Sequence, residues 1–137
     1  MPLVSVTRLR LRSWWFFPPF FWHAQKSQAQ ARRADGIFAV QLRPYGGAFW
    51  TLTLWRDHAA MRAYMIAGSH RVAMPRLQHW CDEASVANWE QDAATLPTWA
   101  EAERHLVAHG RISTVRHPSA AHSAGFTLGS QKEPSQA

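Results

Sequence analysis

The stretch IFAVQLRPYGGAFWTLTLWR at residues 37–56 decides the fold of this chain. Its two halves, residues 37–43 and 49–56, are rich in β-branched and aromatic residues, which favour extended strands. Between them, the Pro-Tyr-Gly-Gly connection at residues 44–47 supplies residue types that tight turns need. The stretch therefore predicts two neighbouring strands that form an antiparallel hairpin.

The segment before this hairpin predicts one strand and one helix. Residues 3–12 alternate in character, so that leucines near the end share one face and arginines share the other. Residues 20–34 have a helix-forming composition, and Asp35-Gly36 ends the helix because glycine tolerates the left-handed conformation found there.

The segment after the hairpin repeats this pattern in reverse order. Asp57 is the expected N-cap of a helix over residues 59–67, and a second helical piece is expected over residues 69–83. Residues 85–91 alternate again and predict a fourth strand.

The rest of the chain predicts one helix and little else. Thr98 and Glu101 form a capping box that opens a helix ending at His109. Residues 111–116 predict a short edge strand, and residues 118–137 have the composition of a disordered tail.

The order strand, helix, strand occurs twice, which predicts an α+β fold. We expect a ferredoxin-like βαββαβ antiparallel sheet with an extra C-terminal helix, in one domain over residues 1–117. The helices of such a fold cover one sheet face and leave the other bare. Because the bare face would be apolar here, a second copy is its expected cover, and we predict a homodimer.

The composition excludes several classes of protein. The chain has 137 residues and a formal net charge of +6, which is compatible with nucleic acid, an anionic membrane surface or acidic ligands. A single cysteine, Cys81, excludes an intrachain disulfide and any multi-cysteine metal site. We expect Cys81 to be a small buried hydrophobe and the protein to be cytoplasmic.

An aromatic run, Trp14–Trp22, is the most unusual segment of the sequence. It is interrupted by two prolines and is far shorter than the roughly 20 residues that span a bilayer. Arginines precede it, and Lys26 follows it. Two interpretations remain open: the rings pack the first helix against the sheet, or they form a peripheral membrane contact that admits a lipophilic substrate.

Several motifs resemble one superfamily. Leu52-Thr53-Leu54-Trp55, a helix over 57–64 and then Gly68-Ser69-His70 are similar to the dimeric α+β barrel superfamily, which includes antibiotic-biosynthesis and haem-degrading monooxygenases. Residues 69–75 (SHRVAMP), with 80–85 (WCDEAS) and 88–90 (NWE), look most like a bacterial branch near the spheroidene monooxygenase-like proteins. The resemblance covers about residues 3–117.

The resemblance implies a function and a set of site residues. Haem-degrading members use an Asn on the first strand, a Trp ending the third and a His on the next helix. Trp55 and His70 match the last two, whereas the first strand holds no Asn. The implied function is a monooxygenase-like enzyme for a small hydrophobic molecule, in a pocket between the sheet and the second helix. Its cofactor is left open, with haem as one candidate.

The resemblance also implies a role for each of these residues. His70 would act as acid–base group or haem ligand, and Arg8 would hold an anionic group such as a carboxylate or propionate. The pocket would be lined by Trp55, Tyr64, Trp80 and Thr53. The simpler interpretation is that His70 bonds near a helix N-terminus and that both Trp55 and Trp50, on opposite strand faces, only pack.

Other functions remain as alternatives. The same scaffold could be a non-catalytic carrier of a lipophile or haem, or a membrane-peripheral module. RNA binding is the weakest alternative, because Phe49 and Trp50 are adjacent and so face opposite ways, whereas RNA-recognition sheets stack bases on rings two residues apart. His105 and His109 lie one helical turn apart, but without a further ligand we expect a solvated face and no metal site.

Overall fold

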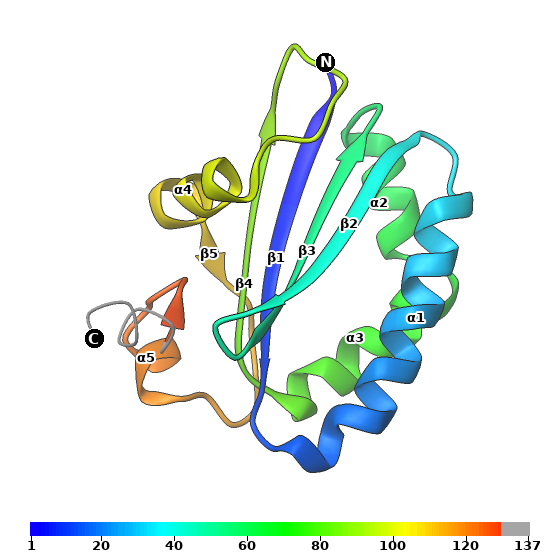
Figure 1. The fold of residues 1–137 in the computed structure, drawn as a ribbon. Coiled ribbons are helices and arrows are strands. Elements are labelled where there is room, and N and C mark those ends of the chain that lie inside the picture. The colour runs from blue at the N-terminus through cyan, green and yellow to red at the C-terminus, as the bar shows by residue number, and fades with distance from the viewer. Residues whose placement is uncertain (130–137) are drawn as a thin grey trace.

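The computed structural model describes residues 1–129 and shows a five-stranded antiparallel sheet with helices on both faces (Figure 1). The strand order is β2-β3-β1-β4-β5. The elements are β1 (Leu3–Leu11), the 3-10 helix η1 (Trp14–Phe16), α1 (Phe17–Arg33), β2 (Ile37–Tyr45), β3 (Ala48–Trp55), α2 (His58–Met65), α3 (Gly68–Trp80), β4 (Cys81–Glu90), α4 (Trp99–His109), β5 (Arg111–Ile112) and α5 (Ala120–Ser123). The predicted α+β, ferredoxin-like fold class is confirmed.

The hairpin forms where the sequence predicts it. Tyr45 pairs with Ala48, and the two turn glycines, Gly46 and Gly47, have φ of 62° and 77°, a region that favours glycine. β3 then pairs with β1, and β1 pairs on its other side with β4, so β1 lies at the centre of the sheet.

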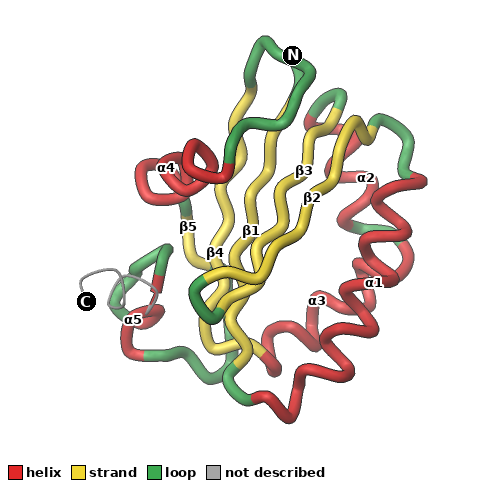
Figure 2. Tube along the Cα trace, in the orientation of Figure 1, coloured by secondary structure: helices red, strands yellow, loops and turns green. Residues whose placement is uncertain are grey.

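Helices α1, α2 and α3 cover one face of the sheet (Figure 2). α2 begins at the predicted N-cap, since the Asp57 carboxylate accepts the backbone N–H of Ala60 at 2.9 Å. Under this layer, Leu3 and Trp55 pack against Ala60 and Met61 in a hydrophobic core cluster. We call these three helices together with η1 the helix layer.

The opposite face of the sheet is covered too, which corrects the prediction of a bare face. Trp50 and Leu52 are fully buried there against Leu106 of α4 and Leu128 of the C-terminal segment. Figure 1 shows α4 and α5 on the side of the sheet away from α1–α3. The uncovered apolar surface that motivated the predicted homodimer is therefore filled by the chain itself.

Residues 118–129 are structured, so the predicted disordered tail is wrong for this part, while residues 130–137 lie outside the described residues. Ser85 donates its hydroxyl to the carbonyl oxygen of Thr127 at 2.6 Å, and Thr127 donates its own hydroxyl to Leu106 at 3.1 Å. The small polar residues that suggest disorder thus satisfy backbone groups, and Leu128 supplies the apolar anchor.

A buried ion pair ties the C-terminal segment to the sheet. Arg8 Nη1 donates to Glu83 Oε1 at 2.9 Å, Arg10 Nη1 donates to Glu83 Oε2 at 3.0 Å, and the Ser119 hydroxyl donates to the same Oε2 at 2.7 Å. A side chain at Gly129 would collide with the Glu83 carboxylate. Burial lowers the pKa of Arg8, although the Glu83 carboxylate opposes this shift.

Three predicted boundaries also change. The helix expected to run to residue 83 ends at Trp80, because β4 starts at Cys81, directly opposite Leu11 of β1. The first helix starts at Phe17, with prolines in its first turn, where no N–H is needed. The edge strand β5 spans two residues, Arg111–Ile112.

Cys81 is fully buried, as predicted. Burial raises the pKa of its thiol to about 12.

Among the described residues, no helix is long and apolar enough to cross a bilayer.

Candidate functional site

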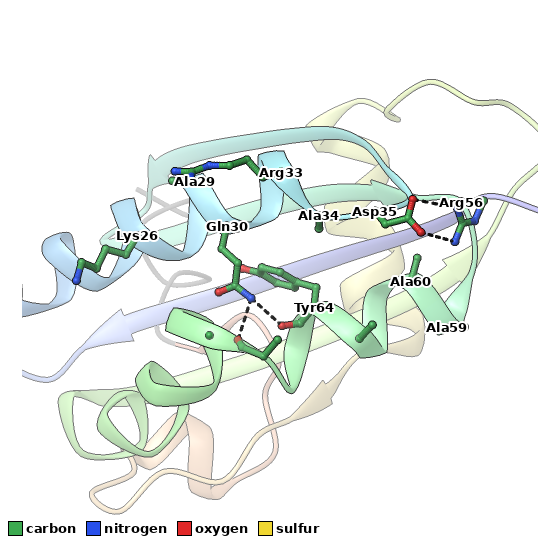
Figure 3. A pocket seen from close by; sticks show the side chains of 13 residues that line it. Lys26, Ala29, Gln30, Arg33, Ala34, Asp35, Arg56, Ala59, Ala60 and Tyr64 are labelled. Carbon is green, nitrogen blue, oxygen red and sulfur yellow. Dashed lines mark hydrogen bonds and ion pairs between the residues drawn. The ribbon is translucent and has the colours of Figure 1, made fainter.

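A groove of about 820 Å³ lies between α1 and α2 (Figure 3). Small side chains form most of its walls, and long polar side chains stand on its rim. Its lining comprises Lys26, Ala29, Gln30, Arg33, Ala34, Asp35, Arg56, Ala59, Ala60, Ala63, Tyr64, Ala67 and Gly68. The predicted pocket lay between the sheet and the second helix, whereas this groove lies between two helices.

Gln30 joins α1 to the junction of α2 and α3. Its Nε2 donates to the carbonyl oxygens of Tyr64 at 3.2 Å and Ala67 at 2.8 Å, and its Oε1 accepts the backbone N–H of His70 at 2.9 Å. Gly68 lies between them with φ of +53°, and a Cβ there would come within 3.2 Å of the Gln30 side chain. One amide thus satisfies helix-end groups of α2 and α3 and fixes the groove's width.

Tyr64 forms the floor of the groove. Its hydroxyl donates to the carbonyl oxygen of Ser27 on α1 at 3.1 Å. Burial raises the pKa of this phenol to about 12, so it stays protonated at neutral pH. Its ring lies 5.2 Å from that of Trp55 and 4.7 Å from that of His70, so three rings form a column from the sheet to the start of α3.

His70 is held as a neutral imidazole at the end of this column. Its Nδ1 lies 3.2 Å from the carbonyl oxygen of Met65, which can only accept a hydrogen bond, so Nδ1 carries the proton and Nε2 is the basic nitrogen. Burial lowers the pKa of His70, and the bond to Met65 opposes this shift only in part.

The rim of the groove is cationic. Lys26, Arg33 and Arg56 stand on it with a single carboxylate, Asp35, which pairs with Arg56 at 3.4 Å. The hydrogen bond to Asp35 is the main cause that raises the pKa of Arg56, with Asp57 second. These side chains are exposed, so they can turn toward an anionic group bound between the helices.

The structure brings together only some of the predicted site residues. Tyr64 lines the groove, and Trp55 and Thr53 lie buried beneath it, where Trp55 Nε1 donates to Thr53 Oγ1 at 2.9 Å. Trp80 lies at the far end of α3 against His23, with 5.5 Å between their rings. The Arg8 side chain lies on the sheet face away from the groove, where it binds Glu83.

Two features of the site were missed from the sequence. Lys26, Gln30 and Arg33 recur at spacings of four and three residues, which places them on one face of α1. Ala59, Ala63 and Ala67 recur every four residues and form a stripe of small side chains opposite them. Both signals are visible in the sequence, but they mark a groove only once α1 and α2 are known to be neighbours.

The groove does not fit a haem iron. Its lining contains no histidine, cysteine or methionine, and the hydroxyl of Tyr64 is engaged by Ser27 with its pKa raised. His70, the ligand implied by the resemblance, bonds Met65 and packs against Tyr64 with the ring planes tilted by 50°, outside the lining. Among residues 1–129, no three His, Cys, Asp or Glu side chains gather as ligands for a metal ion.

Comparisons with solved structures agree with the fold. The protein Rv0793 from Mycobacterium tuberculosis superposes with a TM-score of 0.63 at 14% identity, covering 69% of this chain and 100% of that chain. SnoaB, a cofactor-independent oxygenase from Streptomyces nogalater, gives a TM-score of 0.56 at 16% identity, covering 71% of this chain and 98% of that chain. A protein described as an antibiotic biosynthesis monooxygenase gives 0.60 at 13% identity, covering 66% and 99%.

These likenesses show the fold alone, which is an α+β ferredoxin-like fold. No curated protein matches the chain in sequence. A family profile matches residues 15–136, a range that includes α1–α5 and the strands β2–β5 but not β1. The chain therefore belongs to the family described as Domain of unknown function (DUF3291).

Proposed function

We propose that this protein is a cofactor-independent oxygenase for a flat, hydrophobic molecule that carries an acidic phenol or enol. The observation that carries the proposal is the groove between α1 and α2, with alanine walls and the cations Lys26, Arg33 and Arg56 on its rim, of which Arg56 pairs with Asp35 and Asp57. Alanine methyl groups from two facing helices leave room for a planar ring system, and the cations favour its anion.

The chemistry follows from what the groove supplies and what it lacks. Lys26, Arg33 and Arg56 lower the pKa of a bound phenol or enol, so the substrate ionises without a dedicated base. An electron-rich anion can pass electrons to O₂ directly. At a doubly activated methylene group, two C–H bonds break, one oxygen atom becomes the carbonyl oxygen and the other leaves in water, so the substrate supplies all four electrons.

The buried column supports this role by holding the floor in place. Trp55 and His70 fix the ring of Tyr64 from both sides, and Ser27 fixes its hydroxyl. The floor is therefore rigid, and it excludes water from one side of the bound ring. We assign positioning roles to Trp55 and His70, because neither contacts the groove in the described chain.

The structural neighbour SnoaB is a cofactor-independent oxygenase, which supports an oxygenase reaction without cofactor. The sequence resemblance to spheroidene monooxygenase-like proteins supports a lipophilic substrate. One observation favours a second candidate function, a carrier that binds the same molecules without turnover. The polar groups on the groove floor, Tyr64 and Gln30, are both engaged by backbone atoms.

The test measures binding and oxygen consumption together, without added cofactor. The probes are a polycyclic phenol with an activated methylene group and a neutral polyene. We expect the phenol to bind and to consume one O₂ per molecule converted to the ketone. Ala63→Trp should abolish both effects by filling the groove, whereas Ala108→Trp, on the exposed face of α4, should preserve them.

The outcomes separate the two candidates. Binding of the phenol that Ala63→Trp abolishes, with no O₂ uptake, would identify a carrier and overturn the oxygenase. Equal binding by Ala63→Trp and Ala108→Trp would overturn the groove as the site.

A further inference from the structure

We infer that the helix layer is a docking surface for an anionic lipid bilayer, with the aromatic rings of η1 and early α1 as its insertion point. The rings in question are those of Trp14, Trp15, Phe21 and Trp22, which we call the aromatic tip. Their exposed fractions are 73%, 89%, 51% and 60%. Side chains of this size and exposure, gathered within nine residues, indicate an interaction site.

Packing does not explain the aromatic tip, because other members of the same run already do that work. Phe20 and Phe17 pack on Phe49 of β3, with ring centroids 4.8 Å and 5.9 Å apart. The run therefore divides into an inner row that fixes α1 on the sheet and an outer row that is mostly exposed, although Trp14 and Phe21 of the outer row also contact Phe17, with ring centroids 5.8 Å and 5.7 Å apart. The inner row matches the first sequence-based interpretation, packing of the first helix against the sheet. The outer row is the part to which the second interpretation, a peripheral membrane contact, applies.

The outer row has the composition of a bilayer interface. Tryptophan prefers the boundary between headgroups and acyl chains, where its apolar ring and polar N–H are both accommodated. Lys26 places its Nζ 4.7 Å from the ring of Trp22, which belongs to the outer row. A cation above an inserted ring lies at the depth of lipid phosphates.

Charge complementarity selects an anionic surface. Residues 1–34 and 58–81, which contain η1 and all of α1, α2 and α3, include no Asp or Glu. The same three helices carry Lys26, Arg32, Arg33, Arg62, Arg71 and Arg76. The negative charges of the chain lie instead in the loops at the ends of the layer, in β4 and in the chain that follows it.

The remaining exposed apolar residues of the layer favour lipid over other anionic partners. Ile66 and Val72 are 65% and 53% exposed, and Val72 borders a hollow of about 380 Å³ that Lys26 also lines. Aliphatic side chains give nothing to base stacking, which is what a nucleic acid would require. A second copy docked by this face would place cations against cations, which opposes association.

The experiment is flotation of the whole chain with vesicles of phosphatidylcholine, with or without about 30% phosphatidylserine. We expect binding to the anionic vesicles alone, weakened by roughly 0.5 M salt. We also expect a blue shift of tryptophan emission and quenching by brominated lipid, because the rings enter the interface.

Matched variants test each half of the argument. Trp15→Ser with Trp22→Ser should weaken binding by about ten-fold or more, while Val107→Ser, at a site on α4 that is 54% exposed, should change it less than about two-fold. Arg71→Glu should weaken binding to anionic vesicles, and Arg104→Glu, on α4, should not. Circular dichroism checks that each variant is folded.

Several results would overturn the inference. One is an absence of flotation with anionic vesicles at low salt, and another is equal flotation with both vesicle types. A dimer that Trp15→Ser dissociates would identify a second copy as the occupant. A gel shift with single-stranded RNA, without flotation, would identify a nucleic acid instead.

Discussion

Replacing Glu83 by Gln tests the buried ion pair between Arg8 and Glu83, which links the C-terminal segment to the sheet. The Arg8 and Glu83 side chains are 1% and 2% exposed, and the Glu83 carboxylate also accepts bonds from Arg10 and Ser119. Removing its charge leaves the Arg8 guanidinium buried without a counter-charge from Glu83. Breaking one side of such a pair costs about 3–5 kcal/mol of unfolding free energy.

The assay is urea unfolding followed by tryptophan fluorescence and circular dichroism. With a slope of about 2 kcal/mol per molar urea, the loss should move the midpoint down by roughly 2 M. The matched control is Asp35→Asn, because Asp35 pairs with Arg56 but is 92% exposed. An exposed pair of this kind contributes about 0–1 kcal/mol, so the control midpoint should hardly move.

A double variant separates charge burial from loss of packing. Arg8→Met with Glu83→Leu removes both charges and fills the space, which in other buried pairs is neutral or stabilising. We expect it to be more stable than Glu83→Gln. The reasoning is refuted if Glu83→Gln costs no more than Asp35→Asn, or if the double variant is the least stable of the three.

Three further predictions concern stability. Leu128→Ala should cost about 2–5 kcal/mol in urea unfolding, whereas Val107→Ala, at an exposed site on α4, should stay within about 0.5 kcal/mol; equal losses would show that Leu128 does not anchor the C-terminal segment. Trp55→Ala should cost about 3–5 kcal/mol by emptying the space under the groove, and a near-zero loss would contradict its burial. The pKa values of Cys81 and Tyr64 are both raised to about 12 in the fold, so the unfolded chain loses these protons first. Unfolding free energy should therefore be fully retained below about pH 9 and fall toward pH 12, and Cys81→Ala and Tyr64→Phe should each flatten this fall in a pH series of urea midpoints.

The parts of the fold that depend on local signals were predictable from the sequence. The glycine turn of the hairpin, the Asp57 cap and the Thr98 cap each depend on groups within a few residues of one another. The end of α3 was not predictable in this way, because Leu77, Cys81 and Ala84 recur at helical spacing. The chain forms strand β4 from Cys81 onward instead of continuing the helix, because Cys81 pairs with Leu11 of β1, about 70 residues earlier in the chain.

The C-terminal cover and the groove depend on contacts that no local pattern contains. Leu128 is one apolar residue among small polar ones, and it stabilises the fold because it packs in the same core cluster as Leu106. The groove requires the relative placement of α1 and α2, so the sequence pointed to Trp55, Tyr64 and His70 but missed Gln30. Arg8 illustrates the opposite error, since a buried arginine expected to bind a ligand binds the chain's own Glu83.

Lys26 and Gly68 line both the α1–α2 groove and the smaller hollow between α1 and α3. If the helix layer rests on lipid, this shared border lies next to the bilayer. A sparingly water-soluble molecule dissolved in the membrane would then reach the groove by lateral diffusion in two dimensions, without first partitioning into water. Apparent affinities measured in buffer and on vesicles would differ by the partition coefficient of the molecule, so ligand screens should include both.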